Sequence, residues 1–303
     1  MIHRTSHTPR LSHTARVAAL CLLSTLTTAA PAALLNLADA PLYLLTTVDP
    51  NILLTFDDSG SMSWGYLPDR LDDTPTNGGP PGGPLYDNAR GCASNINAVY
   101  YDPTVTYIAG VDKDGNTLGN ASFTAAWYNG YNLTAAGAHQ GTIVNLATSF
   151  IATWVTNSSI TSTGTNTGNA ASCGTGTAAG QAAYYYTYNT GCALAGGVDN
   201  DACYTRVQHN NPTAWTAAQQ ENFANWYSYY RTRNQLAKSA VGRAFSRLGG
   251  NVRVAAHHLN NTTATSPTRF TKTISVMKAF SGTDRTDFFT RLYNSPASSF
   301  TPL

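Results

Sequence analysis

The stretch that most constrains the fold is residues 51–63, NILLTFDDSGSMS, in which an apolar run ends abruptly in acidic and hydroxyl side chains. The apolar residues from Ile52 to Phe56 do not alternate with polar ones, so they fit a central strand of a parallel sheet covered on both faces. Ligands bind at the carboxyl ends of such strands in open α/β sheets. The polar residues after this strand therefore predict a binding site.

The spacing Asp-x-Ser-x-Ser, formed by Asp57, Ser59 and Ser61, suits a hard divalent cation. Mg²⁺ prefers oxygen ligands in near-octahedral geometry and keeps several of its waters. One carboxylate and two hydroxyls supply part of that shell, and they leave positions for another loop and for a partner's carboxylate. The alternative is a strand-to-helix turn in which Asp57 caps a helix, and these residues alone do not decide between the two.

The composition indicates an exported globular protein. Charged residues make up 11% of the 303 residues, whereas 42% are hydrophobic and 11% aromatic, which argues against wholesale disorder. The net charge is only +2. Because nucleic-acid binding requires a basic stripe, we expect no DNA or RNA partner.

Residues 1–32 read as a secretory signal peptide. Three arginines precede the apolar stretch 17–26, which is too short to span a bilayer, and small residues follow it. Cleavage is expected after Ala32, or as late as Ala40. No transmembrane segment is expected after the signal peptide has been removed.

Removal of the signal peptide also removes Cys21 and leaves four cysteines, which are Cys92, Cys173, Cys192 and Cys203. An even number in an oxidising compartment predicts two disulfides. Four cysteines allow three connectivities, and the sequence does not choose among them. Proximity along the chain makes the pair Cys192 and Cys203 plausible.

Residues 64–212 read as a large β-rich insertion. It begins with the Gly/Pro run TNGGPPGGP and continues as short strands and turns. The sequence DKDGN at 112–116 predicts a tight turn rather than a calcium loop, because Phe123 stands where a bidentate Glu is needed. The tyrosines within 184–188 are expected to pack the core of the insertion, the alternative being a patch that stacks on sugars or binds a protein.

Helical order returns in residues 213–303. Thr216 and Gln219 have capping-box spacing, and apolar residues recur with a helical period up to about residue 248, with a break expected near 231–234. The Gly-Gly pair that follows should end this helix.

Two strands and a short helix are expected next, at 251–260, at 270–280 and at 282–293. The two strands should be antiparallel to each other. His257 and His258 read as ordinary strand residues, because no third metal ligand lies at a helpful spacing.

Four stretches together carry a family resemblance: PNILLTFDDSGSM at 50–62, NFANWYSYYRTRNQLAKSAVGRAF at 222–245, YYDPTVTY at 100–107 and CYTRVQ at 203–208. With the order of elements described above, they resemble the von Willebrand factor A domain. More narrowly, they resemble the N-terminal part of the PilC/PilY family of type IV pilus tip-associated adhesins.

This resemblance implies an α/β, Rossmann-like von Willebrand factor A domain that is incomplete at its C-terminus. Its first strand and metal loop are residues 41–63, and the domain continues at 213–303 after the insertion. The strands expected beyond residue 303 are missing, so the strand at 51–56 would be left with an open edge, which is an aggregation hazard. We therefore expect the chain to be an N-terminal fragment of a larger protein.

The resemblance also implies a metal-ion-dependent adhesion site. Asp57, Ser59 and Ser61 match its first segment, and Thr301 matches the threonine of its second loop. The Asp of its third segment is absent. The expected cation is Mg²⁺, or else Mn²⁺ or Ca²⁺, and the truncation implies weak or no binding by the fragment alone.

The function implied by the resemblance is that of an exported adhesin or pilus biogenesis factor at the periplasm or outer-membrane surface, associated with the pilus or secreted. Its partners would be pilin or minor pilins and a host or abiotic surface ligand with an acidic group. The alternative within the family is a structural role in pilus-tip assembly or against retraction. We expect no enzyme: a secreted hydrolase using Asp57 and Ser59 with a His lacks a Gly-x-Ser-x-Gly elbow and a partner identifiable by spacing.

Overall fold

The computed structural model describes residues 48–67, 89–150, 152, 182–260 and 268–297. Residues 49–303 form one compact unit. The predicted signal peptide, Cys173 and Thr301 lie outside the described residues.

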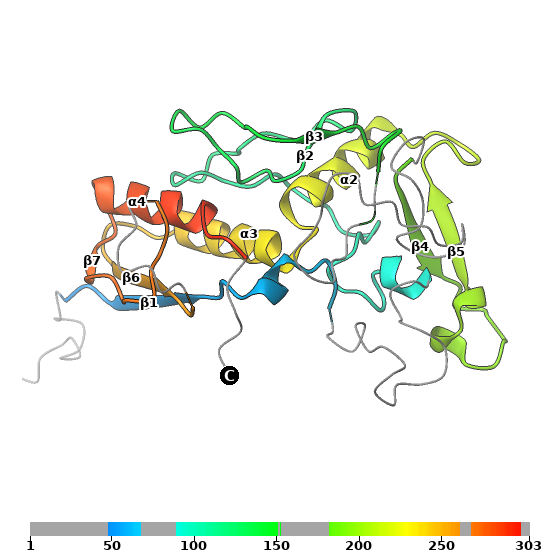
Figure 1. The fold of residues 1–303 in the computed structure, drawn as a ribbon, viewed down its shortest axis with the longest axis horizontal. Helices are drawn as coiled ribbons and strands as arrows, with labels where there is room; N and C mark the ends of the chain where they lie inside the picture. Colours follow the sequence, from blue (N-terminus) through cyan, green and yellow to red (C-terminus); the bar gives the residue numbers. More distant parts are fainter. Residues whose placement is uncertain (1–47, 68–88, 151, 153–181, 261–267, 298–303) are drawn as a thin grey trace, which may run out of the picture. The chain divides into compact units, whose positions relative to one another are not determined.

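A three-stranded sheet has the order β1-β6-β7 (Figure 1). Strand β1 (Asn51–Phe56) pairs in parallel with β6 (Arg253–His258), and β7 (Lys278–Ala279) pairs antiparallel with β6. The parallel register runs from Asn51 opposite Arg253 to Phe56 opposite His258. The described residues therefore form a mixed α/β structure, in which two segments about 200 residues apart share one ladder.

The prediction that β1 is covered on both faces was wrong for the described part of the chain. Ile52, Leu54 and Phe56 face a core that also contains residues of α3 (Arg233–Ser246) and α4 (Gly282–Tyr293), whereas the side chain of Leu53 is 50% exposed. The reason is that α3 and α4 lie on the same side of the sheet (Figure 1). Among the described residues no element covers Leu53.

The predicted helix is divided into α2 (Ala217–Tyr229) and α3, with the expected break at residues 230–232. The capping box of Thr216 and Gln219 is present at the start of α2. Thr232 caps α3 by accepting a hydrogen bond from the backbone N–H of Gln235. Helix α3 ends at Ser246, before the Gly-Gly pair that the sequence suggested as its end.

The predicted strand at 270–280 is reduced to the two residues of β7. Before β7 the segment contacts β6 without a regular ladder, because the Ser275 hydroxyl, not a carbonyl, accepts the hydrogen bond from the Ala256 N–H at 2.9 Å. The carbonyl of Thr271 accepts from the His258 N–H at 2.8 Å. Helix α4 matches its predicted bounds.

Within its described residues, the insertion contains two small antiparallel sheets and three short 3₁₀ helices. One sheet pairs β2 (Ala126–Trp127) with β3 (Ile143–Val144), and the other pairs β4 (Tyr184–Tyr188) with β5 (Tyr204–Gln208). The 3₁₀ helices are η6 (Ala89–Cys92), η7 (Gly197–Asp199) and η8 (Asp201–Cys203). The DKDGN turn forms as predicted: Asp112 N–H donates to the Asn116 carbonyl at 2.8 Å, and Gly115 has φ of 85°.

The tyrosines of β4 pack the core of the insertion, as expected. Tyr184, Tyr185 and Tyr186 are buried in a cluster that also takes Phe223 and Trp226 from α2. The indole N–H of Trp226 donates to the Val99 carbonyl at 2.9 Å, which satisfies its one polar group inside the cluster. Helix α2 is therefore held by the insertion.

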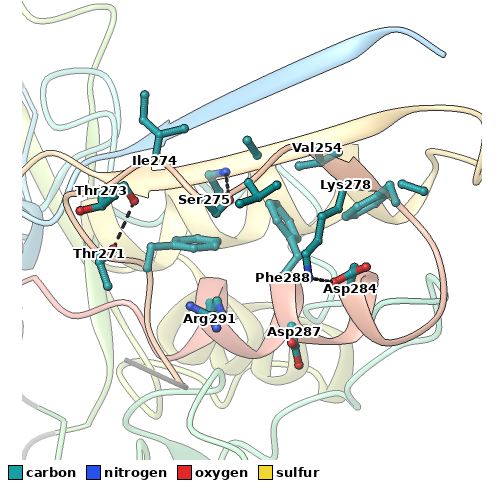
Figure 2. A pocket seen from close by; sticks show the side chains of 16 residues that line it. Val254, Thr271, Thr273, Ile274, Ser275, Lys278, Asp284, Asp287, Phe288 and Arg291 are labelled. Carbon is teal, nitrogen blue, oxygen red and sulfur yellow. Dashed lines mark hydrogen bonds and ion pairs between the residues drawn. The ribbon is translucent and has the colours of Figure 1, made fainter. Parts of the chain in front are cut away.

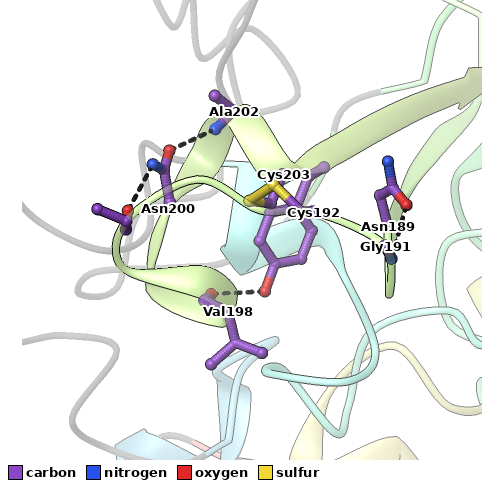
Figure 3. The surroundings of a disulfide bond; sticks show 9 residues. Asn189, Gly191, Cys192, Val198, Asn200, Ala202 and Cys203 are labelled. Atoms are coloured by element: carbon purple, nitrogen blue, oxygen red, sulfur yellow. Dashed lines mark hydrogen bonds between the residues drawn. A yellow bond between two sulfur atoms is a disulfide. The ribbon is translucent and has the colours of Figure 1, made fainter.

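The expected disulfide between Cys192 and Cys203 is confirmed, and Figure 3 shows its surroundings. In the loop that it closes, the Asn200 side chain donates to the Ala195 carbonyl at 2.9 Å and accepts from the Ala202 N–H at 3.0 Å. Cys92 is also disulfide-bonded, and its partner lies outside the described residues.

At Gly242 the side chain of Tyr293 from α4 packs directly against the backbone of α3. A Cβ there would overlap the hydroxyl oxygen of Tyr293 and would lie 3.3 Å from its Cζ. Gly242→Ala should therefore lower the free energy of unfolding by about 1–3 kcal/mol, as overpacking does. This sign is opposite to the gain of roughly 1 kcal/mol that alanine normally gives in a helix.

Urea denaturation followed by tryptophan fluorescence measures this loss. The same substitution should cost less when it is made in a Tyr293→Phe background, which lacks the overlapping oxygen. If Gly242→Ala were as stable as the wild type, the described packing of α3 against α4 would be wrong.

Candidate functional site

The Asp-x-Ser-x-Ser turn lies where the parallel strands β1 and β6 both end. Because Phe56 pairs with His258, the residues after each strand meet at the same edge of the sheet. The backbone N–H of Asn260 donates to the Asp58 carboxylate at 2.9 Å, and its side-chain amide donates to the Ser59 hydroxyl at 3.3 Å. The parallel pairing thus holds the turn from its β6 side.

Within the turn, Asp57 folds back onto Ser59. One carboxylate oxygen of Asp57 accepts from the Ser59 N–H at 2.8 Å and also from the Ser59 hydroxyl. The 3₁₀ helix η2 (Gly60–Ser63) follows. In the described part of the chain, the other carboxylate oxygen of Asp57 and the hydroxyl of Ser61 have no hydrogen-bond partner, and both residues are partly exposed.

The donor set and its charge fit a hard cation. Among the described residues, no lysine, arginine or histidine lies within ion-pair distance of Asp57, so its negative charge is uncompensated. A carboxylate with two hydroxyls is a set of oxygen ligands of the kind that Mg²⁺ takes. No group of three His, Cys, Asp or Glu side chains suited to a metal occurs in the described ranges.

The far end of the turn is fixed by the first residue of α3. The Arg233 backbone N–H donates to the Trp64 carbonyl at 3.0 Å, and its Nε donates to the Tyr66 carbonyl at 2.7 Å. The guanidinium also lies 5.0 Å from the centre of the Trp64 ring, within range of a cation–π contact. The arginine-rich junction between α2 and α3 therefore positions the candidate metal turn.

Behind the turn, His258 lies between Asp58 and Ser295, and all three side chains are buried. The Ser295 hydroxyl donates to the Arg291 carbonyl at 2.8 Å, so it accepts from His258 Nε2 at 2.7 Å. The other ring nitrogen is 3.7 Å from the Asp58 carboxylate. Burial lowers the pKa of His258 more than Asp58 raises it, so the ring is neutral at pH 7.

The order carboxylate, imidazole and serine is that of a nucleophilic triad, but the burial opposes that function. Ser295 is 1% exposed and its proton is engaged by a helix carbonyl, so no substrate could reach it. The ring nitrogens of His258 face Ser295 and Asp58 rather than Ser59, the serine considered for a hydrolase. The arrangement instead joins the turn after β1, the end of β6 and the end of α4.

Sequence reasoning missed Asp58, His258, Asn260 and Ser295 as parts of this site. The paired Asp57-Asp58 and His257-His258 doublets, each at the end of a strand, were the available signal. In each doublet the first residue is partly exposed and the second is buried. Thr301, the predicted second-loop ligand, remains a prediction because it lies outside the described residues.

A cavity of about 640 Å³ lies away from the acidic turn, between β6, the segment before β7, and α4 (Figure 2). Phe288 lines it, and Lys278 pairs with Asp284 at 2.6 Å at one end. Neither Asp57 nor the serines of the turn lines this cavity.

No helix in the described residues is long and apolar enough to cross a membrane.

The site and sheet together define a mixed α/β protein with an oxygen-rich acidic turn at the carboxyl edge of a parallel strand pair. Proteins named type IV pilus biogenesis factor PilY1 from Pseudomonas aeruginosa are similar to it. The protein from strain UCBPP-PA14 is 33% identical over 278 residues, and that from strain PAK is 32% identical over 295 residues. These matches cover 89% and 93% of this chain.

The chain belongs to the PilC/PilY family. It spans about a fifth of the length of these curated relatives, 21% and 22% respectively. No family model matches the chain. No solved structure matches it either, so the von Willebrand factor A fold stays a prediction.

Lys238 of α3 is a further buried ionisable group near His258, and its burial predicts that stability depends on pH. Its amine donates to the Tyr293 carbonyl at 2.8 Å, and burial lowers its pKa from 10.5 to about 7, with a smaller effect from Arg269. Between pH 7 and pH 10.5 the Lys238 amine is protonated in the unfolded state and largely neutral in the folded state. The free energy of unfolding should therefore rise with pH above 7, by up to about 1.4 kcal/mol per unit.

Urea denaturation at pH 7, 8 and 9 measures this rise. The upper limit of pH 9 keeps the measurement below the titration of the buried tyrosines. Lys238→Met should flatten the rise and be more stable than the wild type at pH 7, because the neutral side chain fills similar volume. An unchanged slope in this variant would assign the pH dependence to other groups.

Proposed function

We propose that this chain is part of an exported type IV pilus biogenesis factor in which the turn at Asp57, Ser59 and Ser61 binds a divalent cation. Through that cation the protein would hold an acidic group on a surface ligand. Similarity to the PilY1 proteins supports the pilus assignment. The observation that carries the cation is that, among the described residues, the Asp57 carboxylate has no cationic partner and the hydroxyl of Ser61, four residues later, has no hydrogen-bond partner.

When bound, the cation would supply an open coordination position for the ligand's carboxylate. The protein's own residues do the positioning. Asn260 restrains Ser59, and Arg233 restrains the backbone after η2, so the oxygen ligands are held by two separate elements. Preorganised ligands reduce the conformational entropy lost on binding.

Thr301 is proposed as a further ligand. Helix α4 ends at Tyr293, and Ser295 just beyond it is hydrogen-bonded to His258 behind the turn. The chain therefore passes close to the metal turn only a few residues before Thr301. This proximity supports the assignment that the family resemblance suggested.

The second candidate is a structural role at the pilus tip, in assembly or against retraction, with pilin or minor pilins as partners. The names of the relatives favour it, because they state biogenesis and not adhesion. Under this proposal the acidic turn would contribute to folding or docking rather than to a surface ligand.

Asp57→Ala should abolish stabilisation of the full-length protein by Mg²⁺ or Mn²⁺. A cation at 100 times its dissociation constant stabilises a folded protein by about 2.7 kcal/mol, which thermal unfolding with and without EDTA detects. Asp114→Ala removes an exposed acid from the DKDGN turn and is the matched control. Protection that survives Asp57→Ala would exclude the proposed site.

A strain carrying Asp57→Ala separates the two functional candidates. If the turn acts in adhesion, surface pili should be present in normal number while Mg²⁺-dependent attachment is lost. If it acts in assembly, pilus number itself should fall. Electron microscopy of pili together with an attachment assay on the same cells measures both.

A further inference from the structure

A cavity of about 380 Å³ lies at the start of α2, beside the loop of residues 101–108. This volume is in the range of small-molecule sites. No residue of the acidic turn lines it. It is therefore a candidate site distinct from the one proposed for the cation.

One side of the cavity is aromatic. The rings of Tyr101 and Tyr185 are 5.1 Å apart, Tyr185 is 5.7 Å from Trp215, and Tyr101 is 5.6 Å from Tyr107. Three of these rings belong to the buried residues Tyr101, Tyr185 and Trp215. Tyr107 and Ile108, which also line the cavity, are more exposed. Burial raises the pKa of Tyr101 and of Tyr107 to about 12, so both hydroxyls keep their protons at neutral pH.

The other side is made of amides that are already fixed in place. Asn222 accepts from the Tyr107 N–H at 2.7 Å and donates to the Val105 carbonyl at 2.8 Å. Asn225 donates to the Tyr107 carbonyl at 3.0 Å. These bonds use the N–H and carbonyl of Tyr107 and the carbonyl of Val105, so a peptide could not pair with this edge of the loop as a strand.

Several polar groups remain available to a ligand. In the described part of the chain the amide nitrogen of Gln219 and the hydroxyls of Thr106 and Tyr185 have no hydrogen-bond partner. Glu221 is exposed and uses one carboxylate oxygen to hold Asn120 at 2.9 Å. Among the described residues that line the cavity there is no lysine or arginine, which disfavours an anionic ligand.

We propose that this cavity binds a neutral saccharide of one or two sugar rings. Sugar hydroxyls both donate and accept, which matches the mixture of amide, hydroxyl and carboxylate groups, and the C–H faces of a sugar ring can lie on Tyr107 and Ile108. The lining has too many polar side chains to suit a lipid chain, and its described residues include no cationic side chain to bind a phosphate. Binding here needs no metal ion and is independent of the proposed function of the acidic turn.

The test uses the full-length protein in EDTA and four probes: D-galactose, N-acetyl-D-glucosamine, lactose and 3′-sialyllactose. Saturation-transfer NMR detects binding, and calorimetry gives the affinity. At least one of the three neutral sugars should bind, and the sialylated sugar should bind more weakly than lactose. Preference for the anionic sugar, or no binding of any neutral sugar, would overturn the proposal.

Ala218→Trp fills the cavity from an exposed position in the first turn of α2 and should weaken sugar binding at least about tenfold, the equivalent of 1.4 kcal/mol. Ala217→Trp is the matched control, because Ala217 is exposed on the same turn but does not line the cavity. Glu221→Gln keeps the shape and should weaken binding severalfold by removing the charged acceptor.

Circular dichroism and the unfolding midpoint should be the same for all three variants, so a loss of binding reports on the cavity and not on folding. Equal affinity in Ala218→Trp and Ala217→Trp would place any sugar site elsewhere and reject this one. Asp57→Ala should bind sugar normally, which separates failure here from failure of the cation site.

Discussion

The parallel pairing of β1 with β6 is the interaction on which the candidate site depends. It joins two segments separated by the whole insertion and sets Phe56 opposite His258. From this register it follows that Asp58 meets Asn260 and that the imidazole of His258 lies behind the turn. A shift of one residue would reverse the faces of β6, expose His258 and remove both contacts.

Helix α2 organises the insertion in a comparable way, but through side chains and not through a ladder. Asn222 and Asn225, one turn apart, satisfy backbone groups of loops more than 100 residues earlier, and Trp226 does the same inside the aromatic cluster. Buried backbone groups that lack secondary structure need such partners. The irregular segments among the described residues of the insertion can therefore be ordered without long strands.

Much of this architecture was predictable from local sequence patterns. The capping box at Thr216, the break after α2, the bounds of α4 and the DKDGN turn follow from local rules about caps and periodicity. The pairing of Cys192 with Cys203 was one of three connectivities that the sequence left open, favoured only by proximity along the chain. The exposure of Leu53 could not be predicted, because it depends on which face of the sheet α3 and α4 occupy. The contacts of Asp58 and His258 could not be predicted either, because they arise only when two distant strands are placed in register.

The packing of α2 has a practical consequence for chimeric proteins. Its apolar face contributes Phe223 and Trp226 to the cluster of the insertion, while α3 contributes Phe245 to the core against the sheet. A graft that moves the insertion to another scaffold should therefore carry α2 with it and be joined at residues 230–232. A junction near residue 212 would leave the transplanted tyrosines without the helix that covers them.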